Sequence, residues 1–147
     1  MLTLEEKREI LEELKQELYQ AKKVFVETCR ENIQLPVYSN IGDAGMDIRA
    51  AEDVVIMPGE TKIIPTGLKI AIPTGYEIQV RPRSGLSLKT PLRIANTPGT
   101  IDSGYRDEIG IIISNCSNFS DELNTYPINE KGNKNGIYSI KFGDRIA

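Results

Sequence analysis

Glycine and proline are confined to one part of this chain. All 12 glycines and all 8 prolines lie at or after Pro36, and the first 35 residues contain neither. Both residue types interrupt helices and favour turns. The chain of 147 residues therefore joins two kinds of sequence, a leading segment that can form a long helix and a larger segment of short elements between turns. The total length is that of one domain.

Residues 1–30 are predicted to form one amphipathic helix. Thr3 followed by Glu6 fits a capping box at its start. Apolar residues then recur at spacings of three, four and seven, at Leu4, Leu11, Leu14, Leu18, Ala21 and Phe25. We expect this apolar stripe to pack against its own domain or a sister subunit. A helix that binds a dedicated protein partner is the alternative.

Residues 31–147 have the pattern of an all-β domain. β-branched runs are separated by turn signals at intervals of about 8–12 residues, which is typical of a sandwich, jelly roll or barrel. Residues 109–114 are the most apolar run and predict a fully buried strand. Residues 117–136 are polar and rich in turn formers, so we expect an excursion between two strands there.

The composition excludes several classes of chemistry. The chain has no histidine and only two cysteines, Cys29 and Cys116, which rules out histidine catalysis and the usual zinc sites. A net charge of −3 argues against nucleic-acid binding or a polybasic membrane anchor. No apolar run is long enough to cross a bilayer. We expect a cytoplasmic protein. Any chemistry it performs must use carboxylates, hydroxyls, basic side chains, backbone amides or a hard metal ion.

Four short segments carry the candidate functional residues: AGMDIRA at 44–50, RPRSGLS at 81–87, NTPGTIDSGYRDEI at 96–109 and FGDRIA at 142–147. The second segment places a guanidinium, a hydroxyl and backbone amides on one turn, which suits phosphate oxygens. The third offers an amide, a carboxylate and an aromatic ring near a hairpin tip. Each segment alone also fits an ordinary turn, so the combination is the informative signal.

Taken together, the four segments resemble the first four motifs of the trimeric all-β dUTPases, over about residues 33–116 and 137–147. The resemblance implies a jelly-roll-like β-barrel or sandwich with an added N-terminal helix. It implies a dUTP diphosphatase that forms dUMP and pyrophosphate, and a homotrimer with sites at subunit boundaries. The sequence ends at Ala147, before the family's glycine-rich fifth motif. Without such an arm we expect weak catalysis and retained nucleotide binding.

The resemblance also assigns the catalytic roles. Asp102 would orient and deprotonate the water that attacks the α-phosphorus. Asp47 would hold, through water, a Mg²⁺ ion carried by the triphosphate, since Mg²⁺ prefers oxygen ligands and keeps several waters.

Substrate recognition is implied in the same way. Asn96 would read the uracil edge, and Tyr105 would lie against the deoxyribose and leave no room for a 2′-hydroxyl. Asp144 and Arg145 would form a supporting ion pair that braces Arg83. The residues expected to contact the substrate are Arg83, Ser84, Gly85, Asn96, Gly99, Thr100, Ile101 and Tyr105.

Two other functions stay open from the sequence. The first is a dCTP deaminase of the same fold, which needs a glutamate near the exocyclic amine; Glu108 is the only glutamate in the third motif. The second is a regulatory protein on a dUTPase scaffold. Residues 1–30 or 117–136 would then form the surface for a protein partner.

Overall fold

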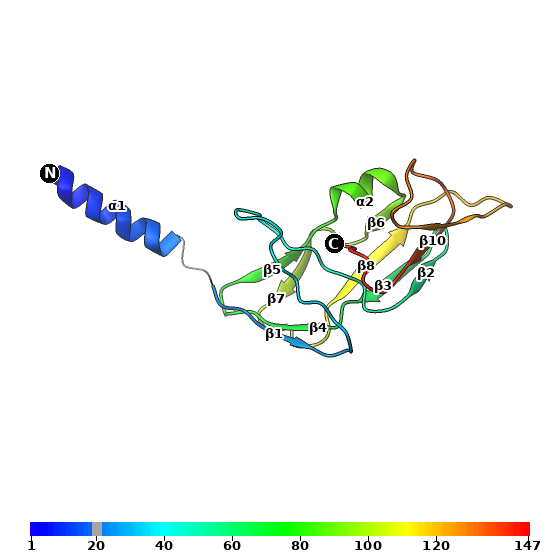
Figure 1. Cartoon of the computed structure of the whole chain (residues 1–147), viewed down its shortest axis with the longest axis horizontal. Coiled ribbons are helices and arrows are strands. Elements are labelled where there is room, and N and C mark those ends of the chain that lie inside the picture. The colour runs from blue at the N-terminus through cyan, green and yellow to red at the C-terminus, as the bar shows by residue number, and fades with distance from the viewer. Residues whose placement is uncertain (19–21) are drawn as a thin grey trace.

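The computed structural model describes residues 1–18 and 22–147. Its elements in chain order are α1 (Leu4–Leu18), β1 (Phe25–Thr28), β2 (Val54–Ile56), β3 (Thr61–Pro65), β4 (Leu68–Ala71), β5 (Glu77–Val80), α2 (Ser84–Lys89), β6 (Leu92–Ile94), β7 (Gly99–Asp102), β8 (Gly110–Asn115), β9 (Thr125–Pro127) and β10 (Ile137–Ile140). Figure 1 shows α1 apart from a body built mainly of strands. The predicted all-β class is confirmed for this body.

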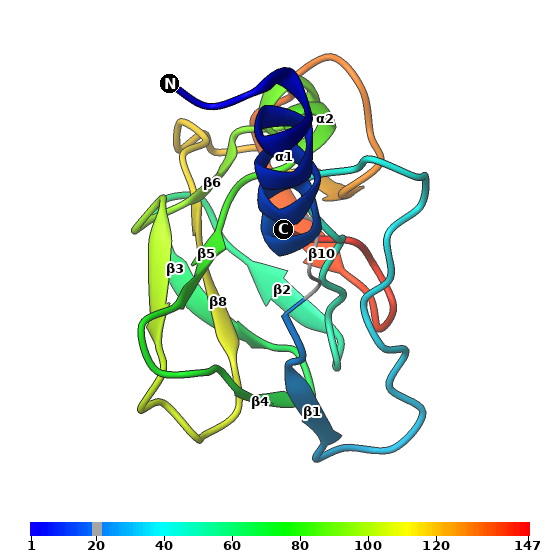
Figure 2. The same ribbon diagram turned by 90° about the vertical axis from the view of Figure 1, so that its left-hand side faces the viewer.

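The strands pair in four small sheets, in the orders β1-β4, β2-β10-β9, β3-β8-β6 and β5-β7. All pairs are antiparallel except β9 with β10, which run parallel. Within the described residues these sheets are open, so they do not close into a single barrel. Figure 2 shows β3 and β8 beside one another on the left, with β1 and β4 at the lower end of the body.

The core lies between these sheets and consists mainly of isoleucine. Its fully enclosed members include Ile56, Ile64, Ile111, Ile113, Tyr138, Ile140 and Ile146. Along β8 buried and half-buried residues alternate, so the prediction of a fully buried strand at 109–114 is wrong. The reason is that β8 lies in an antiparallel sheet and presents only one of its faces to the core.

The predicted helix over 1–30 is correct only in its first part. The capping box is confirmed, because the Glu6 carboxylate accepts the Thr3 N–H at 2.7 Å and the Thr3 hydroxyl accepts the Glu6 N–H at 3.2 Å. The helix ends at Leu18, and residues 19–21 lie outside the described residues. Side chains 4–17 are all exposed, so the expected packing of the stripe against its own domain is wrong.

Residues 25–28 form a strand where the helical prediction continued. β1 pairs antiparallel with β4, from Phe25 opposite Ala71 to Thr28 opposite Leu68. Val24, Phe25 and Val26 are β-branched or aromatic, and such residues favour strands when a neighbouring strand is available. Pairing with β4, more than 40 residues later in the chain, therefore overrides the local helical spacing.

The segment 117–136 is an excursion, as predicted, and it is attached at two places. β9 adds to the free edge of β10, and the base of the excursion is closed by Ser117, whose hydroxyl accepts the Gly136 N–H at 3.0 Å. Figure 1 shows the segment in yellow to orange at the end of the body opposite α1. Among the described residues, neither helix has the length and apolar character needed to cross a membrane.

Candidate functional site

Asp47 links the first, second and fourth sequence segments. Its Oδ1 accepts a hydrogen bond from Arg83 Nε at 2.9 Å, and its Oδ2 accepts one from Arg145 Nη1 at 3.1 Å. Burial by itself raises the pKa of Asp47, but the two guanidinium groups outweigh it and hold that pKa below its usual value. The carboxylate is therefore ionised at neutral pH and fixes the direction of both arginines.

Backbone pairing explains why these segments meet. The Ile48 N–H donates to the Ala147 carbonyl, and the Ile146 N–H donates to the Ile48 carbonyl, both at 2.9 Å. Ala50 N–H likewise donates to Asp144 O at 2.8 Å. The C-terminal segment thus runs along the first segment as an irregular antiparallel pair, which carries Arg145 to Asp47.

The predicted ion pair between Asp144 and Arg145 is wrong. The Asp144 carboxylate accepts the Lys141 N–H at 2.8 Å and closes the turn of 141–144. Arg145 pairs with Asp47 instead. Its link to Arg83 is made by the backbone, since Arg83 Nη1 donates to the Arg145 carbonyl at 3.3 Å. Neighbouring residues on an extended segment point to opposite sides, which separates the two side chains.

Arg83 immediately precedes α2, with Ser84 and Gly85 in its first turn. Arg83 and Gly85 are partly buried, whereas Ser84 is exposed. A Cβ placed on Gly85 would meet no atom within 4 Å, so this turn is open to a ligand. The predicted cluster of guanidinium, hydroxyl and amides is present on one short stretch.

The third segment is held beside the second by β5 and β7. Val80 lies opposite Gly99, and Glu77 lies opposite Asp102. Because the second segment leaves β5 directly after Val80, it starts beside the turn that precedes β7. Asp102 is exposed at the far end of β7. The Tyr105 N–H donates to the Asp102 carbonyl at 3.1 Å, so these two residues share one tight turn.

The other hairpin residues divide by burial. Ile101 is 9% exposed and its side chain belongs to the core, whereas Asn96 and Thr100 are exposed. Gly99 packs closely, since a Cβ there would lie 3.3 Å from Asn96 Nδ2 and 3.4 Å from Val80 Cβ. The Asn96 amide thus lies directly against the start of β7. Only the backbone of Ile101 is placed to contact a ligand.

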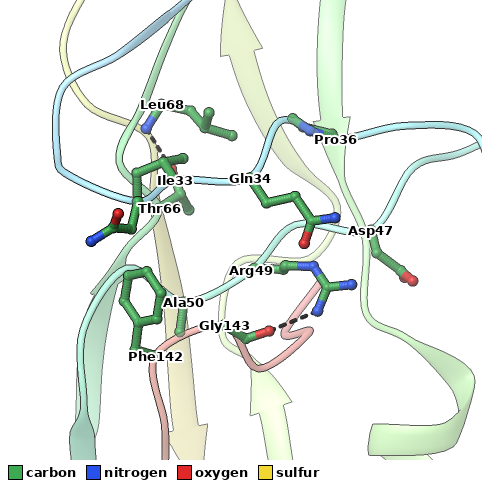
Figure 3. Close-up of a pocket in the computed structure, with 11 residues that line it drawn as sticks. Ile33, Gln34, Pro36, Asp47, Arg49, Ala50, Thr66, Leu68, Phe142 and Gly143 are labelled. Atoms are coloured by element: carbon green, nitrogen blue, oxygen red, sulfur yellow. Dashed lines mark hydrogen bonds between the residues drawn. The ribbon is translucent and has the colours of Figure 1, made fainter.

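A small cavity lies on one side of Asp47 (Figure 3). Its volume is about 80 Å³, and segments 32–36, 47–50, 66–68 and 142–143 contribute lining residues. Arg49 Nη1 crosses this region to the Gly143 carbonyl at 2.8 Å. Pockets that bind drug-sized ligands measure roughly 300–1,000 Å³, so this cavity is too small for a nucleotide. Sequence reasoning gave no sign of it, because its lining comes from segments far apart in the chain.

Glu108 forms a second carboxylate–arginine contact that the sequence did not indicate. Its Oε1 accepts from Arg30 Nε at 2.6 Å and from the Gly67 N–H at 2.8 Å. The hydrogen bond from Arg30 is the main reason why the pKa of Glu108 is lowered. Arg30 and Glu108 are 78 positions apart, and no local spacing links them.

These contacts define an all-β protein in which Asp47 orients Arg83 at the start of α2, beside the hairpin that leads into β7. The chain belongs to the dUTPase family, whose family model matches residues 31–126. The matched region holds the first three segments. The fourth segment lies outside it and joins the first by the backbone pairing described above.

Curated relatives agree with this assignment. The deoxyuridine 5′-triphosphate nucleotidohydrolase of Fusobacterium nucleatum is 53% identical over 100 residues, covering 66% of this chain and 68% of that protein. The protein of the same name from Finegoldia magna is 51% identical over 120 residues, covering 80% and 72%. Across these and five further relatives, the match spans 58–72% of the relative's length.

Solved structures extend the similarity to most of the chain. The dUTPase of S. aureus phage phi11, described as coordinating a structural Mg(II) ion, is 36% identical with a TM-score of 0.77. That comparison covers 86% of this chain and 87% of the phage protein. The dUTPase of staphylococcal phage 80alpha with dUpNHpp reaches a TM-score of 0.78 at 35% identity, covering 86% and 80%.

Proposed function

We propose that this chain hydrolyses dUTP to dUMP and pyrophosphate. The observation that carries the proposal is the carboxylate of Asp47 between Arg83 and Arg145 at 2.9 and 3.1 Å. It joins three of the four motif segments around a turn suited to phosphate. The names of the curated relatives and the bound dUTP analogue of the phage 80alpha enzyme support the same substrate.

Asp102 is the proposed base of this reaction. It accepts a proton from a water molecule whose oxygen attacks the α-phosphorus. The bond from that phosphorus to the α–β bridging oxygen breaks, and its electron pair leaves with pyrophosphate. Arg83, the Ser84 hydroxyl and the amide of Gly85 offset the negative charge on the phosphates. Exposure of Asp102 at the end of β7 leaves its carboxylate accessible to such a water.

The donor set fits Mg²⁺. Within the described residues no three His, Cys, Asp or Glu side chains cluster, so the chain offers no complete metal cage of that kind. Mg²⁺ commonly takes one or two carboxylates, substrate phosphates and waters. Each Asp47 oxygen accepts one N–H from an arginine and has capacity for a metal-bound water. When bound, the ion neutralises phosphate charge, while Asp47 holds its water shell in place.

The hairpin of 96–105 is the proposed nucleoside site. The Asn96 amide pairs with the uracil edge, helped by the backbone of residues 99–101. Tight packing of Gly99 against Asn96 and Val80 supports exclusion of a 5-methyl group. Tyr105 is 43% exposed, so a face of its ring is available to the deoxyribose.

We further propose that the chain acts as a homotrimer in the cytoplasm. Large apolar side chains on the body are exposed, such as Ile63 at 66% and Leu88 at 78%. Sites at subunit boundaries fit the absence of a nucleotide-sized cavity beside Asp47 in the described chain. Two unpaired cysteines, Cys29 and Cys116, support a reducing compartment.

The test is pyrophosphate release from dUTP, dCTP, dTTP and UTP, with Mg²⁺ and then with EDTA. We expect turnover of dUTP alone and its loss in EDTA. Asp102→Asn should lower kcat by about 10²–10⁴-fold, as expected when a general base is removed, with an unchanged melting temperature. Full turnover by Asp102→Asn refutes the assignment of the base, and equal rates on dCTP and dUTP refute the specificity. Sedimentation should give three times 16.4 kDa.

The alternative of a dCTP deaminase is not favoured. Its required glutamate would be Glu108, but both oxygens of this carboxylate are held by Arg30, at 2.6 and 3.1 Å, and one also by the Gly67 N–H. A carboxylate engaged in this way cannot also shuttle protons at a base. Ammonia release from dCTP would overturn this conclusion.

A further inference from the structure

The Arg30 side chain connects its own segment with Glu52 and with Glu108, near the end of the third motif. Its Nε and Nη2 donate to the two oxygens of Glu108 at 2.6 and 3.1 Å, and its Nη1 donates to Glu52 Oε2 at 3.0 Å. This is a bidentate arginine–carboxylate pair with a second carboxylate on the remaining side, a geometry that fixes orientation as well as charge. Arg30 lies just outside residues 31–126, where the family model matches.

The backbone around Gly67 closes the same junction. Gly67 donates its N–H to Glu108 Oε1 and accepts the Cys29 N–H, both at 2.8 Å. Its φ is +71°, and a Cβ at this position would come within 2.5 Å of the Ile33 side chain, so only glycine fits. Arg30 and Glu108 are therefore held against a tightly packed turn, and a shift of one would be transmitted to the other.

Glu108 in turn holds Tyr105. The Tyr105 hydroxyl donates to the Glu108 carbonyl at 2.9 Å, while the Tyr105 N–H donates to the Asp102 carbonyl at 3.1 Å. Glu108 thus connects Arg30 to the tyrosine ring, with its side-chain carboxylate bound to Arg30 and its backbone carbonyl bound to the Tyr105 hydroxyl. The hydroxyl bond sets the ring position, and the exposed ring remains free for a ligand.

We propose that Arg30 is a positioning residue that fixes the Tyr105 ring and thereby sets the preference for deoxyribose over ribose. The inference rests on the proposed function, in which Tyr105 lies against the sugar. Arg30 itself touches neither the nucleotide nor the reacting atoms. A ring that can move away from the sugar leaves space for a 2′-hydroxyl, so loss of Arg30 weakens dUTP binding and improves the relative use of UTP.

The experiment measures kcat and KM for dUTP and UTP with the full chain and with Arg30→Ala, Arg30→Lys and Tyr105→Phe. Arg30→Ala should raise KM for dUTP roughly tenfold, less than the about 10²-fold cost of a 1 Å misplacement at a reacting group, with kcat nearly unchanged. The ratio of kcat/KM for dUTP over UTP should fall. Tyr105→Phe removes only the hydroxyl that donates to Glu108 and should lower this ratio by a similar factor. Combining it with Arg30→Ala should lower the ratio little further than either change alone.

Two variants separate positioning from simple destabilisation. Arg30→Lys keeps the positive charge but loses the bidentate contact with Glu108. Its ratio of kcat/KM for dUTP over UTP should therefore lie between those of Arg30→Ala and the wild type. Lys134→Ala breaks an exposed ion pair with Glu130, also at 3.0 Å, on the remote excursion, and should change neither KM nor the ratio. An unchanged dUTP-over-UTP ratio in Arg30→Ala overturns the inference, as does an equal loss of kcat on both nucleotides with a lowered melting temperature. A wild-type chain that neither binds dUTP nor turns it over refutes the proposed function first.

Discussion

Asn115 gives the sharpest test of how the excursion 117–136 is attached. The side chain is 1% exposed at the end of β8. Its Nδ2 donates to the carbonyls of Ile56 at 2.9 Å and Gly136 at 2.8 Å, and its Oδ1 accepts the Ser117 N–H at 3.0 Å. One buried amide therefore joins β2 to both ends of the excursion. We predict that Asn115→Ala strongly destabilises the fold.

The magnitude follows from these three bonds. Each contributes about 1 kcal/mol net, and a buried N–H left without a partner costs about 1–3 kcal/mol. The Ser117 N–H loses its side-chain acceptor, whereas the Gly136 carbonyl keeps the Ser117 hydroxyl as a donor at 3.1 Å. Two lost bonds, to Ile56 and Gly136, at about 1 kcal/mol each, and about 1–3 kcal/mol for the Ser117 N–H, give an expected loss of about 3–5 kcal/mol in the free energy of unfolding. At about 2–4 °C per kcal/mol for chains of 150–250 residues, the melting temperature should fall by about 10 °C.

The assay is urea and thermal unfolding followed by circular dichroism at one fixed protein concentration, because the apparent stability of an oligomer depends on concentration. Asn115→Leu keeps the volume without the bonds and should be destabilised to a similar degree. The matched control is Asn118→Ala on the exposed surface nearby, which should change stability by less than about 0.5 kcal/mol. A loss below about 1 kcal/mol for Asn115→Ala, or equal losses in the control, would refute the reasoning.

Three further predictions concern the junction and the helix. Gly67→Ala should unfold at a lower urea concentration, because φ is +71° and the new Cβ would meet Ile33 at 2.5 Å. The pKa of Glu108 is lowered from 4.5, so its stabilising effect is complete above that pH and lost as the pH falls through the lower folded value. The free energy of unfolding should therefore fall less steeply with decreasing pH in Glu108→Gln than in the wild type. Removal of residues 1–18 should leave hydrolysis of dUTP unchanged in a kinetic assay, since the side chains at 4–17 are exposed.

The candidate site residues could be chosen from the sequence because they lie within short segments. Arg83, Ser84 and Gly85 are adjacent in the sequence, so their side chains and amides stay close together whatever the distant fold. Asn96 and Gly99 are three positions apart, and the glycine has a local reason, the close approach of the asparagine amide. Residue type and spacing within one turn carry this information without knowledge of the tertiary structure.

Contacts between distant segments could not be predicted in the same way. Phe25 continues the helical spacing of Leu4, Leu11 and Leu18, yet it lies in a strand because Ala71 and its neighbours offer an edge. Arg145 was expected to pair with its neighbour and instead reaches a carboxylate 98 positions away. An exposed ion pair leaves no periodic signal in the sequence, so only the fold reveals which charges meet.

The two arginine contacts of Asp47 explain how an acidic residue can lie beside a proposed phosphate site. Two guanidinium groups and one carboxylate leave one positive charge, so Asp47 does not cancel the attraction for an anion. It engages Arg83 through Nε, and Nη1 faces the Arg145 carbonyl. Within the described residues, this leaves Nη2 for an incoming phosphate oxygen. A side chain already fixed on two of its nitrogens loses little freedom when the third binds. We therefore propose that Asp47 favours nucleotide binding by orienting Arg83 before the nucleotide arrives.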